Sequence, residues 1–107
     1  MKDRLRAFVE AHSEGWNHED WLGLLNELRQ EGVDVSDPDG LGQQLERTRL
    51  EWELRRRAVP GLGPKRSDAL VDRFGSFWRL QHASVEEVAR VPRMTRGLAE
   101  KVIEALR

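Results

Sequence analysis

The stretch Val59–Arg66 combines the residue types of a tight turn with those of an anion site. Its two glycines, Gly61 and Gly63, can take positive φ and let another molecule approach the backbone closely. The proline that follows them suits the first position of a helix. Backbone N–H groups would then face outward beside the positive helix end and the cations Lys65 and Arg66. Such a site accepts an anion, most simply a phosphate, although a plain structural turn explains the same residues.

A second copy of this frame begins 32 residues later, in Val91–Gly97. Each copy reads Val-Pro, one residue, a long apolar residue and then a residue that opens a helix. Thr95 stands where Gly63 stood, and threonine is a good N-cap. Two copies of one hairpin indicate a paired unit. Two phosphate-facing turns related by a pseudo-twofold axis could contact the two strands of a duplex.

The sequence gives little support for a disulfide, a metal site or a catalytic site. The chain has no cysteine, so disulfides and thiolate metal sites are excluded. The cluster His18-Glu19-Asp20 could suggest a metal, but helix capping and the helix dipole explain both acids. No Walker loop, nucleophile motif or unexplained carboxylate cluster occurs. We therefore expect no catalytic residue, no metal and no cofactor.

The elements that position the two turns are predicted to be helices. Charged residues make up 35% of the 107-residue chain and strand signals are weak, which indicates an all-α protein. Helix starts follow from capping residues and stops from glycines. The expected helices span about 2–11, 17–31, 38–58, 64–74, 77–80, 84–91 and 96–106. The third is long enough to bridge an N-terminal part and the hairpins.

Side-chain periodicity also predicts which faces are buried. In the second helix Trp21, Leu22, Leu25 and Leu28 are expected to face inward. Trp78 has two interpretations, packing in or against the core, which we favour, or stacking on a base or a protein partner. The run Arg55–Arg57 is either a solvated helix end or a source of one phosphate contact.

Charge divides the chain into two parts. Residues 1–46 hold four Lys/Arg against eleven Asp/Glu, whereas residues 47–107 hold fourteen against eight. We therefore expect an acidic helical N-terminal segment, 1–46, and a basic domain, 47–107. A basic domain is typical of a nucleic-acid interface. The alternatives are that the two parts attract each other, or that the acidic segment covers the basic face.

Residues from about 50 to 107 resemble the tandem helix-hairpin-helix domain at the C-terminus of the bacterial excinuclease C proteins, and that of XPF-type nucleases. The resemblance is carried by Val59–Arg66, Phe74–Ser76, Ala83–Val88 and Gly97–Val102. It implies DNA binding without sequence preference, from the minor-groove side, often to junctions or partly single-stranded DNA. The acidic nuclease motif of the larger proteins is absent, so no catalytic site is implied.

Carried over by position, the resemblance names the DNA-binding residues. The second hairpin has Arg93 where the family usually has glycine, so its turn is expected to be distorted, although this cation could itself meet a phosphate. Some family hairpins hold a monovalent cation, which the sequence does not settle. The DNA-binding residues are Gly61, Leu62, Gly63, Lys65, Arg66, Arg93, Met94, Thr95, Arg96, Gly97 and Lys101.

These observations leave two functions open. The first is a non-catalytic DNA-binding module for duplex, junction or partly single-stranded DNA, in DNA repair or recombination. The second is a protein-interaction or self-association module whose acidic segment binds a partner. No apolar run is long enough for a membrane span and no signal peptide is seen, so we expect a cytoplasmic protein without a membrane partner.

Overall fold

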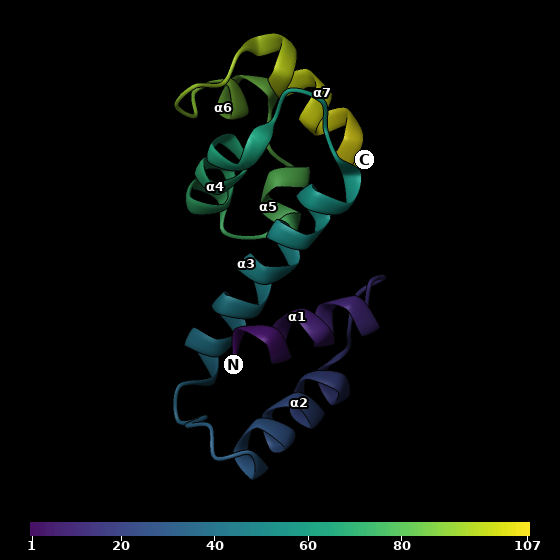
Figure 1. Cartoon of the computed structure of the whole chain (residues 1–107), viewed down its shortest axis with the longest axis vertical. Coiled ribbons are helices and arrows are strands. Elements are labelled where there is room, and N and C mark those ends of the chain that lie inside the picture. The colour runs from purple at the N-terminus through teal and green to yellow at the C-terminus, as the bar shows by residue number, and fades with distance from the viewer.

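The computed structural model describes residues 1–107 and contains seven helices and no strand, which confirms the all-α class. The molecule is elongated, with extents of 46 × 22 × 21 Å (Figure 1). None of the helices has the length and apolar character needed to cross a bilayer. The helices are α1 (Lys2–Ala11), α2 (His18–Gln30), α3 (Pro38–Arg57), α4 (Gly63–Phe74), α5 (Phe77–Gln81), α6 (Val85–Ala89) and α7 (Arg96–Leu106).

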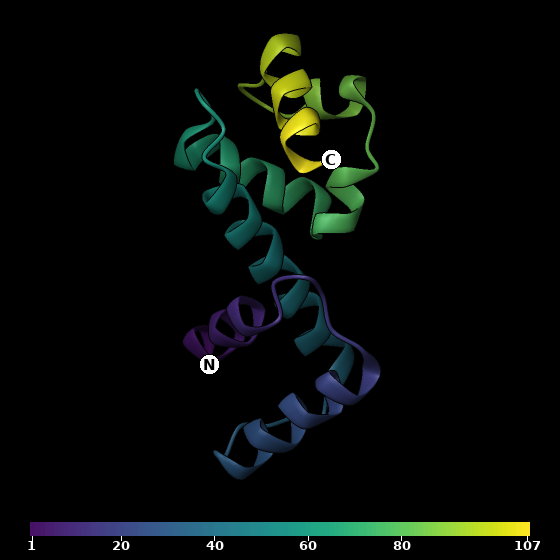
Figure 2. The same ribbon diagram turned by 90° about the vertical axis from the view of Figure 1, so that its right-hand side faces the viewer.

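Helix α3 connects the two ends of the molecule, as both views show (Figures 1 and 2). It begins after Asp37, whose side chain accepts a hydrogen bond from the N–H of Gly40. Pro38 occupies its first position, where no N–H partner is needed. It ends at Ala58, which takes a left-handed φ of 47°. The chain therefore leaves α3 at a sharp bend and enters the first hairpin turn directly.

The apolar side chains form two separate clusters that meet along α3. The smaller cluster lies between α1, α2 and the N-terminal half of α3, with Leu45 as the buried α3 contribution. The larger cluster fills the space between α3 and helices α4–α7, and Leu50 and Leu54 belong to it. One helix thus supplies both cores, while the division of the chain at residues 46 and 47 stays a prediction.

The C-terminal turn of α3 is attached to α7 through Arg57, which also pairs with a buried carboxylate of α3 itself. Glu53 is only 2% exposed and pairs with Arg57, while Arg56 contacts the same carboxylate from outside at 3.1 Å. The Arg57 Nε donates to the carbonyl of Ala105 at 2.7 Å, near the negative end of α7. Burial, and then the nearby charge of Arg49, lower the pKa of Arg57. Two of the three arginines expected at this helix end are therefore engaged within the fold.

Two expectations about buried side chains are wrong. Leu22 is 49% exposed, and Leu24 takes the buried position on α2 beside Leu28. Trp78 is 64% exposed instead of packing in or against the core, and its ring stacks on His82 at 4.2 Å between centroids. Both positions lie on helices whose inward face is selected by the neighbouring helices, which local periodicity does not specify.

Candidate nucleic-acid interface

The first hairpin turn, between α3 and α4, leaves three backbone donors without a partner. Gly61 and Gly63 have φ values of 84° and 67°, in the left-handed region that favours glycine. Between them, the N–H of Leu62 is bonded to the carbonyl of Val59 at 3.2 Å. The N–H groups of Gly61, Gly63 and Lys65 form no hydrogen bond within the chain. The turn therefore presents open donors at the positive end of a twelve-residue helix.

The second turn, between α6 and α7, repeats this arrangement. The N–H of Met94 is bonded to the carbonyl of Val91 at 3.1 Å, as Leu62 is to Val59. Arg93 has a φ of 71°, close to that of Gly61, so the distortion expected from a non-glycine residue does not occur. Thr95 caps α7 by accepting a hydrogen bond from Leu98. The N–H groups of residues 93, 95, 96 and 97 form no hydrogen bond within the chain.

A single side chain holds the two turns side by side. The Arg66 Nε donates to the carbonyl of Arg93 at 2.8 Å, and its Nη1 donates to the carbonyl of Gly61 at 3.0 Å. The Leu98 side chain of α7 also approaches Gly61, lying 3.9 Å from the place where a β-carbon would stand. Both turns lie at the end of the molecule away from α1 and α2 (Figure 1). The open donors of the two repeats thus belong to one surface.

The cations around this surface differ in whether they already form ion pairs with carboxylates. Lys65, Arg93 and Lys101 are exposed and form no ion pair. Arg96 lies between two carboxylates, 3.3 Å from Glu86 and 3.5 Å from Glu100. The pKa of Glu86 is lowered, first by a hydrogen bond from its own backbone N–H and then by the charge of Arg96. The second hairpin therefore has one of its cations already paired.

The acidic N-terminal segment does not cover the hairpins. Its helices α1 and α2 lie at the opposite end of the long axis (Figures 1 and 2). No ion pair joins residues 1–46 to residues 47–107. Several of its acids are used inside the segment; Arg4, for example, bridges Glu27 and Glu31. The structure therefore supports neither mutual attraction by ion pairs nor a covered basic face.

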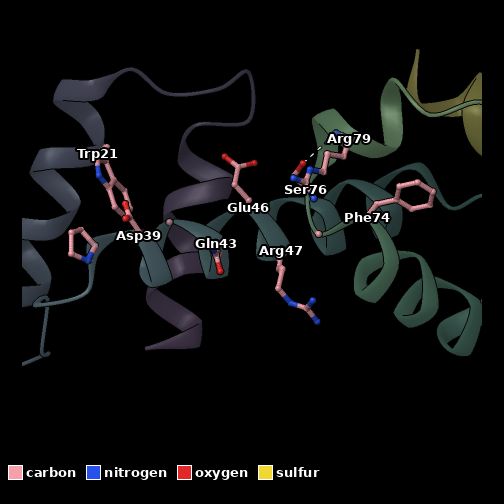
Figure 3. A pocket seen from close by; sticks show the side chains of 11 residues that line it. Trp21, Asp39, Gln43, Glu46, Arg47, Phe74, Ser76 and Arg79 are labelled. Carbon is pink, nitrogen blue, oxygen red and sulfur yellow. Dashed lines mark hydrogen bonds between the residues drawn. The ribbon is translucent and has the colours of Figure 1, made fainter.

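Another hollow lies along α3 between the two ends, with a volume of about 810 Å³. Figure 3 shows Glu46 and Arg47 projecting from α3 between Trp21 on one side and Ser76 on the other. Burial raises the pKa of Glu46, against the opposing effect of Arg49. Only two of its eleven lining residues are hydrophobic, so this groove lacks the apolar body of typical ligand sites. Nowhere in the structure do three His, Asp or Glu side chains form a metal-binding group.

Sequence reasoning missed the connections between distant residues. It placed Arg66 near phosphates as a free cation, whereas two of its nitrogens are bonded to turn carbonyls. It listed Arg96 among the DNA-binding residues without its ion pairs to Glu86 and Glu100. The spacing of Glu100 four residues after Arg96 was a visible signal for one of these pairs. No local sequence pattern indicated the hydrogen bond from Arg66 to the carbonyl of Arg93.

Comparison with known proteins agrees with this geometry. Residues 57–107 match the family model of the SAM-like helix-hairpin-helix tandem. UvrABC system protein C of Symbiobacterium thermophilum is 60% identical over 48 residues, which are 45% of this chain and 8% of that protein. The protein of the same name from Klebsiella pneumoniae is 32% identical over 103 residues, covering 94% of this chain and 16% of the relative. That from Aliivibrio salmonicida is 38% identical over 86 residues, covering 80% and 14%.

These matches reach beyond the hairpins into the acidic segment, which the motifs alone did not place. The chain spans only about one-sixth or less of the length of these relatives. No solved structure gives a significant match. The chain therefore resembles the tandem helix-hairpin-helix family over residues 57–107 and the bacterial excinuclease C proteins over most of its length, which confirms the expected resemblance.

Proposed function

We propose that this chain is a non-catalytic module that binds DNA through its phosphates, without reading base sequence, in DNA repair or recombination. The observation that supports this most is the matched pair of turns. Each leaves backbone N–H groups open at a helix start, and one guanidinium holds both turns in one surface. Backbone amides at helix starts are natural phosphate ligands, and they carry no information about base sequence.

The proposed phosphate donors are the open amides of both turns, together with the free cations beside them. Lys65 and Arg93 line one shallow hollow between α4 and the second turn, which Asp68 and Asp72 also line, so a strand passing there would meet two cations and two carboxylates. Leu62 and Met94 take part differently, because their N–H groups are engaged in the turns; Leu62 is buried and Met94 packs partly buried against the same core. The other proposed contacts are Gly61, Gly63, Thr95, Arg96, Gly97 and Lys101.

Fluorescence anisotropy with labelled DNA tests this function. Duplexes of unrelated sequence should bind with similar Kd values, on the order of 10⁻⁴–10⁻⁶ M for a non-specific module. The logarithm of affinity should fall with the logarithm of salt concentration, with a slope of about −0.9 for each phosphate neutralised. A parallel series on a four-way junction and a partly single-stranded fork shows which DNA shape is preferred. Binding that ignores salt, or that depends on one base sequence, would contradict the proposal.

A second candidate function is contact with a protein partner or a second copy of the chain. The observation that favours it is the exposed stack of Trp78 on His82, because large aromatic side chains are enriched at protein interfaces. Sedimentation of the chain alone and of a Trp78→Ser variant separates the cases. A dimer that dissociates in the variant would support self-association, and a monomer at all concentrations would exclude it.

A further inference from the structure

Arg66 is placed to act between the two hairpins instead of at the surface of either. It lies in the first turn of α4, one residue after the exposed Lys65. Its side chain is half-buried, and two of its three nitrogens donate to the carbonyls of Gly61 and Arg93. These two carbonyls stand at equivalent positions, 32 residues apart. The same side chain therefore contacts the same point of both repeats.

The two carbonyls belong to the peptides that set the backbone conformation of the turns. Gly61 and Arg93 are the left-handed residues of their hairpins, with φ values of 84° and 71°. The peptide carbonyl held by Arg66 in the first turn shares its plane with the N–H of Leu62, which bonds to Val59. Fixing this peptide fixes the direction of the open N–H groups on either side. The same relation holds in the second turn through Met94 and Val91.

We propose that Arg66 is a positioning residue that sets the spacing of the two phosphate-binding turns, and that it does not itself bind phosphate as Lys65 does. This inference rests on the proposed DNA-binding function. An arginine suits the role because its planar guanidinium offers several donors in a fixed fork, whereas lysine offers a compact charge on a flexible stem. A pair of sites held at the correct spacing gains affinity, because the second contact becomes intramolecular.

The test compares charge-preserving substitutions of two arginines on the same helix. Arg66→Lys keeps the charge and removes the fork, and Arg73→Lys is the matched control at an exposed arginine of α4 that forms no ion pair. If spacing is the role of Arg66, Arg66→Lys should weaken duplex binding by about tenfold or more, since linked sites differ from single ones by roughly 10²–10⁴. Arg73→Lys should bind within about twofold of the wild-type chain, because Arg73 lies at the other end of α4 from the proposed phosphate donors. Circular dichroism verifies that both variants keep their helices.

NMR of the DNA-free protein measures the position of the second turn directly, through amide resonances that do not depend on DNA binding. In Arg66→Lys, the amide resonances of residues 93–97 should shift, although they lie 27 or more residues away in sequence, while Arg73→Lys leaves them in place. Wild-type affinity and unshifted resonances in Arg66→Lys would overturn this inference alone. Absence of DNA binding by the wild-type chain would instead overturn the proposed function, and with it the role of Arg66 in binding.

Discussion

Gly61 in the first hairpin turn and Arg93 in the second stand at the same place in the repeat, with φ values of 84° and 71°. Two residues later the turns differ, since Gly63 has a φ of 67° whereas Thr95 is extended with a φ of −111° and caps its helix. Both turns nevertheless keep the same internal hydrogen bond and three equivalent open donors, and the second turn adds the N–H of Arg96, where the first has Pro64. The comparison teaches that the donor arrangement is a property of the backbone, which different side chains can support.

The side chains decide how strong each turn is as an anion site. The first turn is lined by glycines and followed by the unpaired Lys65, so nothing stands between its donors and a ligand. The second turn has a cap that stabilises its helix, but its Arg96 is neutralised by Glu86 and Glu100. We therefore expect the first turn to contribute more to DNA affinity and the second to gain more stability from its own side chains.

The largest effect is expected from Gly61→Asp in the first turn. A carboxylate beside the open amides would face the phosphate, and like charges placed together in an interface cost several kcal/mol. Affinity should fall on the order of a hundredfold, measured by anisotropy at fixed salt. Gly61→Asn is the matched control, because asparagine tolerates a left-handed φ and has no charge. Equal losses in both variants would show that bulk, and not charge, excludes the DNA.

Substitutions of Thr95 separate stability from binding in the second turn. Thr95→Ala removes the cap and should lower the free energy of unfolding by about 1 kcal/mol. Thr95→Asp keeps a good cap in an extended conformation, so its stability should remain near that of the wild-type chain, while its DNA affinity should fall. Urea denaturation and anisotropy measure the two quantities. A parallel loss of both quantities in Thr95→Asp would contradict the assignment of Thr95 as a cap beside the phosphate site.

A smaller gain in stability is expected from Arg93→Gly. The left-handed conformation costs a non-glycine residue roughly 1–2 kcal/mol, and glycine loses about 0.5–1 kcal/mol through its greater freedom in the unfolded chain. The free energy of unfolding should therefore rise by up to about 1 kcal/mol, while the salt dependence weakens by about 0.9 for the lost charge if Arg93 meets a phosphate. Arg93→Ala should lose the charge without gaining stability, and an equal gain there would remove backbone strain as the cause.

The smallest effect concerns Glu86 and is visible through pH. Because its pKa is lowered in the folded chain, Glu86 contributes stability above its ordinary pKa of 4.5, and this contribution is lost as pH falls through the lower folded value. The difference in thermal midpoint between the wild-type chain and Glu86→Gln should therefore be present at pH 7 and shrink below about pH 4. The same variant frees Arg96 from one partner and should tighten DNA binding slightly. A stability difference that grows towards low pH would contradict this sign.

Local signals predicted much of this protein because their causes lie within a few residues. The capping box of Asn17 with Asp20 and that of Ser84 with Glu87 are both present, and each joins residues three apart. The start of α3 at Asp37 and the cap of α7 at Thr95 are of the same kind. The two turns were also identified correctly as repeats, since each is held by a bond across three residues.

Features that depend on distant packing were not predictable in this way. Leu22 and Leu24 both fit an apolar stripe on α2, and contact with α1 and α3 selects Leu24. Trp78 was expected to pack against the core because it is large and apolar, yet the short helix α5 places Phe77 and Leu80 inward and leaves the indole outside. Arg57 was expected either at a solvated helix end or at a phosphate, whereas the packing of α7 against α3 gives it the carbonyl of Ala105 to bind.

The sequence by itself determined where the helices begin and end, that two copies of one turn exist, and that charge is divided along the chain. Each of these features depends on residues that are close together in the sequence, so the interactions that produce it are local. Only the tertiary structure decided that the two turns share one surface, that Arg66 connects them and that the acidic segment lies at the far end. These features depend on how the helices pack, because packing brings together groups that are far apart in the sequence.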